Sequence, residues 1–405
     1  MLHANSRAPA ALGLVGSVLG LIFAGYSSVD YASHLDRQLH DMHCSFIPGA
    51  AATAEAEACR AAMYSPYSAL LREQLWGGLP ISLFALGAFC FFAAFSLYLL
   101  LARGQAPKTA VGFFAAVSVT PLLVSLGMFV ISVTQVGALC KTCVGLYVAS
   151  LLVAAGGLLG LFTLKPGPST DPTPSRGRGN AAWVLAWLSG LAITTLFPAA
   201  VYAGSVPDHD RFLTGCGELK QAPDEQDGLV SIRTAASSTP ALLFEDPLCP
   251  TCKAFHERLV GEDVFGKLDI QLSLFPLDNS CNWMLDAPLH PGACTVSKAV
   301  LCGGSRALEV LEWAYEEQQY LTRAGKAGEP ILRAVIKERW GPDMIRCIDD
   351  RQTAANLNRH LHFAADNGIP VSTPQMYLGA RRICDEDTDI GLRYTLSKLA
   401  PEVVK

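Results

Sequence analysis

Long apolar runs dominate the first half of the chain. Five of them approach or exceed the roughly 20 residues that a helix needs to cross a bilayer. They are Ala10–Val29, Leu79–Ala102, Ala110–Val136, Ala138–Leu164 and Ala181–Ala203. The pattern predicts five transmembrane helices. A cleaved signal peptide is the alternative for the first run, but its length and a flank that carries only Arg7 favour a retained helix.

The positive charges of the short loops predict the orientation of these helices, because lysine and arginine stay on the cytoplasmic side. The lysines and arginines before the first run, between the second and third runs, and between the fourth and fifth runs all lie on the same side of the membrane. They are Arg7, Arg103, Lys108, Lys165, Arg176 and Arg178. The loop before Leu79, the turn before Cys140 and everything after Ala203 are then extracytoplasmic.

Residues 166–180 read PGPSTDPTPSRGRGN, a composition typical of a flexible linker. We therefore predict three parts: a four-helix membrane domain over residues 1–165, a cytoplasmic linker with the fifth helix over residues 166–204, and an extracytoplasmic domain over residues 205–405. The membrane involved is the cytoplasmic (inner) membrane, with the last domain on its periplasmic side.

Beyond Val206 the pattern becomes that of a soluble domain. We expect, in order, a strand at Ala241–Phe244, a helix at Lys253–Val260, a strand at Leu268–Leu277, helices within 293–367, a hairpin within 374–384 and a helix at 387–399. This order is that of a thioredoxin fold with a helical insertion. The predicted fold class is thus multi-domain: an α-helical transmembrane bundle followed by a soluble α/β thioredoxin-like domain.

Composition agrees with a membrane protein of an oxidising compartment. Hydrophobic residues make up 51% of the chain and charged residues 17%, too apolar for a wholly soluble enzyme. A net charge of −5 without a basic cluster gives no sign of nucleic-acid binding. Thirteen cysteines are many for a cytosolic protein. Their odd number leaves one unpaired, and Cys90, inside an apolar run, is expected to be a small buried hydrophobic residue.

Two Cys-x-x-Cys pairs carry the candidate chemistry. Cys140 and Cys143 open the fourth apolar run, and Cys249 and Cys252 follow the first strand of the soluble domain. A helix N-terminus stabilises a thiolate, so each pair suits thiol–disulfide exchange. Half of a zinc site is the alternative, but neither pair has a matching Cys or His pair nearby, and we expect no metal.

In the soluble pair we expect Cys249 to be the exposed attacking thiol and Cys252 the buried resolving thiol. Pro250 suits the first turn of a helix because its missing N–H is not needed there. Thr373 and Pro374 resemble the cis-proline loop of thioredoxin-fold proteins, which would pair with an extended substrate peptide. An ordinary trans proline that starts a strand is the alternative.

The membrane part resembles the vitamin K epoxide reductase family, whose bacterial members are often fused through a fifth helix to a thioredoxin-like domain. The features that carry the resemblance are Cys44 and Cys59, Ser65, the Gly77–Pro80 start of the second helix, Cys140 and Cys143, and Tyr147. The resemblance implies a catalytic Cys140–Cys143 disulfide beside a quinone (ubiquinone or menaquinone) held among four helices. Cys143 would face the quinone ring, and Cys140 would exchange with the Cys44–Cys59 pair.

Several of these residues also have structural interpretations. Cys44 and Cys59 could form a static disulfide, and the Ala/Glu-rich stretch between them is longer than in relatives. Ser65 could cap a helix before Pro66, and Tyr147 could anchor the interface. The resemblance favours quinone binding for both.

The remaining cysteines are expected to be structural. Cys281 and Cys294 bracket a proline-containing loop, where a disulfide is favoured over a metal site with His290. Cys302 could pair with Cys347 and Cys216 with Cys384, although sequence does not fix the connectivity.

The sequence therefore predicts a membrane enzyme that oxidises the thiols of exported proteins. Electrons would pass from Cys249/Cys252 through Cys44/Cys59 and Cys140/Cys143 to a membrane quinone. The enzyme alternative is a quinone or quinone-epoxide reductase whose soluble domain acts as a reductase or isomerase. A redox sensor or scaffold without turnover is an alternative of a different class.

Overall fold

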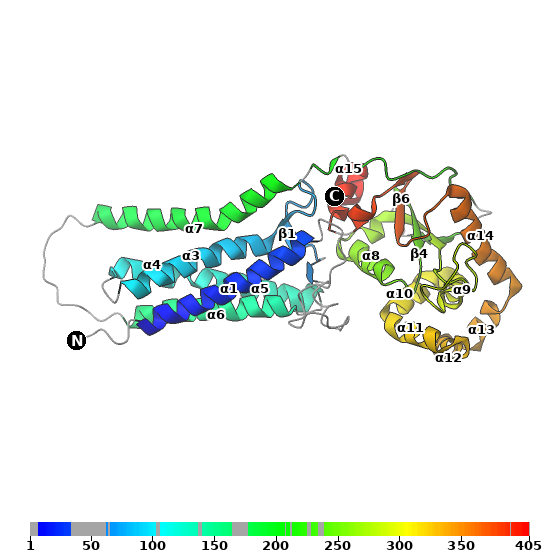
Figure 1. Ribbon diagram of the computed structural model, residues 1–405, viewed down its shortest axis with the longest axis horizontal. Coiled ribbons are helices and arrows are strands. Elements are labelled where there is room, and N and C mark those ends of the chain that lie inside the picture. The colour runs from blue at the N-terminus through cyan, green and yellow to red at the C-terminus, as the bar shows by residue number, and fades with distance from the viewer. Residues whose placement is uncertain are drawn as a thin grey trace. The chain divides into compact units, whose positions relative to one another are not determined.

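The computed structural model describes residues 7–33, 62–63, 65–102, 106–136, 140–163, 177–206, 208–210, 213–224, 228–233, 239–388 and 390–404. The chain forms two compact units, Met1–Pro207 and Asp208–Lys405, which we describe separately (Figure 1).

The first unit is a helical bundle. Its helices are α1 (Arg7–Ser33), α3 (Ile81–Leu101), α4 (Lys108–Val117), α5 (Val119–Ile131), the π-helical turn Ser132–Val136, α6 (Lys141–Phe162) and α7 (Gly177–Ser205). Within the described residues, five helical segments are long and apolar enough to cross a membrane, with α4 and α5 forming one of them. The short strands β1 (Ala69–Leu70) and β2 (Leu79–Pro80) pair antiparallel just before α3.

Small residues let the helices of the bundle approach closely. A Cβ atom added to Gly16 of α1 would lie 2.7 Å from Leu152 Cβ of α6, and one added to Gly156 would lie 2.6 Å from the backbone nitrogen of Gly13. Without a hydrophobic driving force between helices in lipid, such close packing supplies much of their attraction. α1 therefore packs tightly along α6.

The fifth span, α7, packs against α3. A Cβ atom at Gly87 would lie 2.1 Å from the carbonyl oxygen of Thr194, and the rings of Phe95 and Trp187 lie 5.5 Å apart, edge to face. The sequence places this helix with the linker, outside the four-helix domain, whereas in the structure it packs on α3 as part of the bundle.

The second unit is built on a five-stranded sheet with the order β3-β5-β4-β6-β7. These strands are β3 (Val230–Arg233), β4 (Thr239–Glu245), β5 (Leu268–Leu274), β6 (Gln375–Leu378) and β7 (Arg381–Arg382). β4 and β5 are parallel and the other pairs antiparallel. This is the strand order of a thioredoxin fold, so the predicted fold class is confirmed. β3 was not predicted from the sequence.

Helices cover the sheet and form the predicted insertion. They are α8 (Pro250–Gly261), α9 (Ala293–Gly303), α10 (Ala307–Glu316), α11 (Gln318–Ala327), α12 (Glu329–Trp340), α13 (Pro342–Ile348), α14 (Arg351–Asn367), α15 (Leu392–Leu399) and α16 (Pro401–Val404). One apolar core joins the inner face of β4 and β5 to α8, α9 and α10, with Leu243, Leu259, Leu272 and Val300 each at most 1% exposed. This core fixes the start of α8 against the end of β4, which is where the cysteines lie.

Candidate active site

The soluble cysteine pair lies at the N-terminus of α8, as the sequence predicted. Cys249 is the N-cap residue with an extended backbone, and Pro250 occupies the first turn. Helix N-termini present unpaired N–H groups and a partial positive charge. The chain therefore places the sulfur of Cys249 where a negative charge is stabilised.

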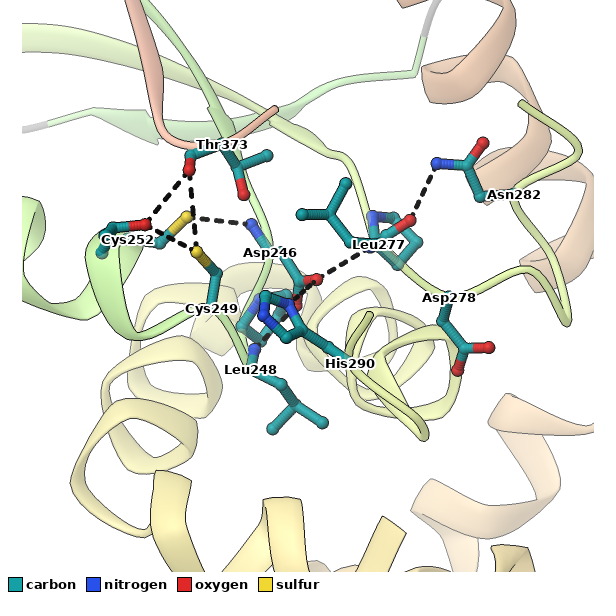
Figure 2. A network of polar contacts seen from close by, with 12 residues as sticks. Asp246, Leu248, Cys249, Cys252, Leu277, Asp278, Asn282, His290 and Thr373 are labelled. Atoms are coloured by element: carbon teal, nitrogen blue, oxygen red, sulfur yellow. Dashed lines mark hydrogen bonds and ion pairs between the residues drawn. The ribbon is translucent and has the colours of Figure 1, made fainter. Parts of the chain in front are cut away.

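The sequence predicts an exposed Cys249 thiol, but in the structure Cys249 is buried. The residue is 4% exposed, and Cys252 is fully buried. The Cys249 Sγ atom lies 2.8 Å from Thr251 Oγ1 and 3.7 Å from the carbonyl oxygen of Thr373 (Figure 2). The peptide bond between Thr373 and Pro374 is cis, as predicted. The loop that bears this bond covers the thiol.

The two thiols have opposite acidities. A hydrogen bond from Cys252 lowers the pKa of Cys249 to about 5, against the effect of burial, and Thr251 contributes further. Burial raises the pKa of Cys252 well above its usual range, and the charge of Cys249 acts in the same direction. In the reduced pair, Cys249 is therefore the thiolate and Cys252 keeps its proton near neutral pH.

A buried carboxyl group lies beneath the pair. Glu245, at the end of β4, has no exposed surface, and its Oε2 accepts a hydrogen bond of 3.0 Å from Tyr315. Burial raises the pKa of Glu245 to about 8, although the hydrogen bond from Tyr315 opposes this. Glu245 can therefore hold or accept a proton next to Cys252 near neutral pH.

A second buried carboxylate, Asp246, organises the backbone around the cysteines. Its Oδ1 accepts from the Leu248 amide at 2.7 Å, and its Oδ2 accepts from the Leu277 amide and from His290 Nδ1, each at 2.8 Å. The Asp246 amide lies 3.4 Å from Cys252 Sγ. Figure 2 shows this carboxylate between the Leu248–Cys249 segment and the segment that carries His290.

The membrane pair has a similar local geometry. Cys140 is the N-cap residue of α6 with an extended backbone, and its Sγ lies 2.8 Å from Thr142 Oγ1. Cys140 is 4% exposed, and Cys143 lies in the first turn of α6 and is partly buried. Each pair thus has its first cysteine at the N-cap of a helix and a threonine in the following turn.

Cys140 and Cys143 lie on the wall of a cavity of about 810 Å³ inside the membrane unit. Its walls come from α1, α3, α5, α6 and α7 and are mostly apolar; they include Phe84, Ala85, Phe89, Met128, Leu146 and Leu188. Small-molecule sites are typically of this size and character. The fifth helix contributes to the cavity, whereas the sequence analysis expected four helices to enclose it.

Ser65 and Tyr147, the residues predicted to bind the quinone, line the same cavity as the two cysteines. The Tyr147 hydroxyl lies 3.4 Å from Ser132 Oγ, and the ring packs edge to face on Phe129. Ser65, Cys140, Cys143 and Tyr147 therefore all line the same cavity. Their role in binding stays a prediction.

The other cysteines are placed as follows. Disulfides join Cys216 to Cys384, Cys281 to Cys294, and Cys302 to Cys347.

Cys90 is an exposed free thiol on α3, so its expected burial is wrong: its side chain points outward from the bundle. Cys44 and Cys59 lie outside the described residues. Where the structure describes the chain, no three His, Cys, Asp or Glu side chains cluster as a metal site would require.

Sequence reasoning missed the groups that tune the soluble pair. Glu245 and Asp246 stand four and three positions before Cys249, but their spacing does not say which partners they meet. Tyr315 and Gln318 come from the helical insertion, and Gln318 Nε2 donates to the Cys249 carbonyl at 3.0 Å. His290 was considered only as a weak metal ligand.

Comparison with known proteins shows which family the membrane unit resembles. Residues 11–156 match the model of the vitamin K epoxide reductase family, and no curated protein matches the chain. A crystal structure of Proteus mirabilis ScsC in a transitional conformation is similar at 15% identity, over 56% of this chain and all of that one, with a TM-score of 0.25. A linker-deletion mutant of ScsC from the same organism, which carries one further substitution, has the same identity and TM-score over 57% of this chain and all of that one.

The match to the family model, the geometry of the two cysteine pairs and the strand order of the second unit lead to the same conclusion. They support a thiol oxidoreductase that spans the membrane several times. Residues 11–156 match the vitamin K epoxide reductase family, and the chain continues beyond them into an α/β domain of thioredoxin topology.

Proposed function

We propose that this protein is a membrane thiol:quinone oxidoreductase that forms disulfide bonds in exported proteins. The observation that carries the proposal is the position of Cys140 and Cys143 on the wall of an apolar cavity between membrane-spanning helices. A dithiol pair in that place can meet a lipid-soluble acceptor on one side and a protein thiol on the other.

The residues around the cavity suit a quinone. Apolar side chains of α3, α5 and α7 provide the surface for a ring and an isoprenoid chain, and Ser65 and Tyr147 provide hydroxyl groups for its carbonyl oxygens. When bound, a quinone accepts two electrons and two protons. Cys143 is the thiol one turn inside α6, and Cys140 at the N-cap is the one that exchanges with another protein disulfide.

At the soluble pair, a substrate thiolate attacks Cys249 Sγ and breaks the Cys249–Cys252 bond. The electron pair of that bond goes to Cys252 Sγ, which takes a proton because its pKa is raised; Glu245 is the adjacent buried acid. A second substrate thiolate then attacks the substrate sulfur of the mixed disulfide. Cys249 leaves as a thiolate, so the substrate loses two electrons and the pair gains them.

Return of the pair to its disulfide requires transfer of those electrons to the membrane unit. We propose that Cys44 and Cys59 accept them and pass them to Cys140 and Cys143, with all three cysteine pairs on the extracytoplasmic side of the inner membrane. The positive charges of the short loops support this orientation. Donor and acceptor on one chain also share an effective concentration on the order of millimolar for short tethers.

The acidity of Cys249 favours oxidation over the alternative reductase activity. A thiolate with a pKa of about 5 stabilises the reduced pair relative to its disulfide, which makes the disulfide a stronger oxidant. Substrate proteins thus give up electrons to it readily.

The proposal is tested by mixing a reduced dithiol peptide with the detergent-solubilised protein and a quinone while following quinone absorbance. We expect steady quinone reduction that is lost in Cys143→Ala and in Cys249→Ala, with Cys90→Ala as the matched control that keeps it. Reduction that continues in Cys249→Ala would show that the soluble pair is not on the path. No reduction by the unaltered protein would favour a sensor or scaffold.

A further inference from the structure

His290 is connected to the redox centre although it lies in a separate loop. Its side chain is 13% exposed, and its Nδ1 donates to Asp246 Oδ2 at 2.8 Å. Its backbone amide also donates to the Leu277 carbonyl at 2.9 Å. The side chain and the main chain of this residue are therefore both fixed against the end of the sheet.

The loop that bears His290 is braced at both ends. The disulfide between Cys281 and Cys294 closes it, and Asp278 Oδ2 accepts from the Gly292 amide at 2.8 Å. A histidine held in this way loses little conformational entropy when it pairs with Asp246. The loop therefore holds the His290 ring against Asp246, close to Leu248 and Cys249, as Figure 2 shows.

Asp246 connects the His290 ring to the two cysteines, so the charge of the ring can affect the stability of the Cys249 thiolate. The carboxylate has no exposed surface, holds the Leu248 amide directly before Cys249, and its own amide lies 3.4 Å from Cys252 Sγ. A buried carboxylate hydrogen-bonded to the residue directly before Cys249 disfavours a thiolate there through like-charge repulsion unless a cation compensates. His290 is the ionisable partner that Asp246 has within hydrogen-bond distance.

We propose that His290 is a positioning residue of the soluble redox centre: as an imidazolium it neutralises Asp246, and so stabilises the Cys249 thiolate and makes the Cys249–Cys252 disulfide more oxidising. The inference rests on the proposed thiol chemistry of this pair. It requires no contact between His290 and the substrate, since the effect passes through Asp246.

The charges around His290 agree with this role. Burial works against the imidazolium, but the hydrogen bond and charge of Asp246, together with the Cys249 thiolate, outweigh it and raise the pKa of His290; Lys326 of α11 opposes them. Asp278 of the same loop is held by the Ser280 and Gly292 amides. Asp246, Cys249 and Lys326 are the charged groups that act on the ring from the surrounding segments.

The test uses the full chain in detergent and two substitutions. His290→Asn keeps a hydrogen-bond donor and removes the charge, whereas His290→Ala removes both. The redox state of the Cys249–Cys252 pair is read by alkylation and peptide mass spectrometry across a series of glutathione buffers at pH 6. His362→Asn is the matched control, because His362 is exposed and packs on Trp283 of the same loop.

Both His290 variants should lower the equilibrium constant for reduction of the pair at pH 6 about fivefold, equivalent to about 20 mV, as a rise of one unit in the Cys249 pKa from about 5 would do. The difference from the unaltered chain should be present at pH 6 and lost as pH rises through the pKa of His290, which the contact with Asp246 raises. The control should change by less than about twofold.

An equilibrium constant for His290→Asn equal to that of the unaltered chain would overturn the proposal, whether or not His290→Ala differs, since a hydrogen bond alone would then suffice. A difference that does not depend on pH would overturn it as well. Should one variant fail to fold, His290→Gln replaces it in the same measurement. The outcome is independent of quinone reduction, so this inference and the proposed function can fail separately.

Discussion

The buried glutamate beneath the redox pair makes a prediction about stability that can be worked out from the structure. Glu245 has no exposed surface, and its Oε1 has no hydrogen-bond partner among the described residues. Its pKa is raised from 4.5 to about 8 in the folded protein, mainly by burial. The fold therefore favours the protonated form.

The sign of the pH dependence follows from linkage. A group whose pKa is raised on folding contributes stability that is present below the unfolded pKa and is lost as pH rises through the folded pKa. For Glu245 this range runs from 4.5 to about 8, and at about 1.4 kcal/mol per pH unit the full loss has an upper limit of about 5 kcal/mol.

Glu245→Gln removes the ionisation and keeps the size of the side chain. We expect the variant to be more stable than the unaltered chain by about 2–3 kcal/mol at pH 8, after a cost of roughly 1–3 kcal/mol for the buried amide. Near pH 4.5 the variant should be no more stable. Its stability should also change less between these two pH values.

Peptide-resolved hydrogen exchange of the full chain measures this difference, because the slowest amides of β4 and β5 report global opening of their unit. Glu338→Gln, at an exposed glutamate of α12, is the matched control and should follow the unaltered chain. Equal pH dependence in Glu245→Gln and the unaltered chain would refute the reasoning, since Glu245 would then not hold its proton in the fold.

Three further predictions concern the two cysteine pairs. Thr251→Val removes the hydroxyl 2.8 Å from Cys249 Sγ and should raise the pKa of Cys249 by about one unit, measured as the pH dependence of its alkylation; an unchanged profile would contradict the assigned contact. Cys252→Ala should accumulate mixed disulfides between Cys249 and exported proteins, seen on non-reducing gels, and absence of such adducts would show that Cys249 is not the cysteine that bonds to substrate. Ala85→Phe, in the cavity wall, should raise the KM for quinone several-fold while the equilibrium of the soluble pair with glutathione stays unchanged; an unaltered KM would place the quinone elsewhere.

The parts of the fold that long or repeated patterns define could be predicted from the sequence. Five apolar runs predicted the membrane spans because length and hydropathy alone decide whether a helix can cross a bilayer. Cys249 before Pro250 predicted the start of α8, since both residues have local preferences for a helix N-terminus. These features depend on neighbours in the chain.

The features that the sequence did not predict depend on distant contacts. Cys249 is covered by the Thr373 loop, 124 residues away, so its burial has no local signal. Glu245 meets Tyr315 across 70 residues, and Asp246 meets His290 across 44. β3 has only four residues, too few for alternation to stand out from the surrounding chain. α7 joins the cavity through contacts that its uniform hydrophobicity does not encode.

Transfer of electrons from the soluble pair to the membrane pair is the central claim, and one measurement tests it most directly. The fully reduced chain is mixed with a quinone, quenched with an alkylating reagent at increasing times, and the oxidation of Cys249 and Cys252 is read by mass spectrometry. In the unaltered protein the pair should become oxidised, and in Cys140→Ala it should stay reduced over the same period. Oxidation of Cys249 and Cys252 at an equal rate in Cys140→Ala would contradict the account, since the electrons would then leave by another route.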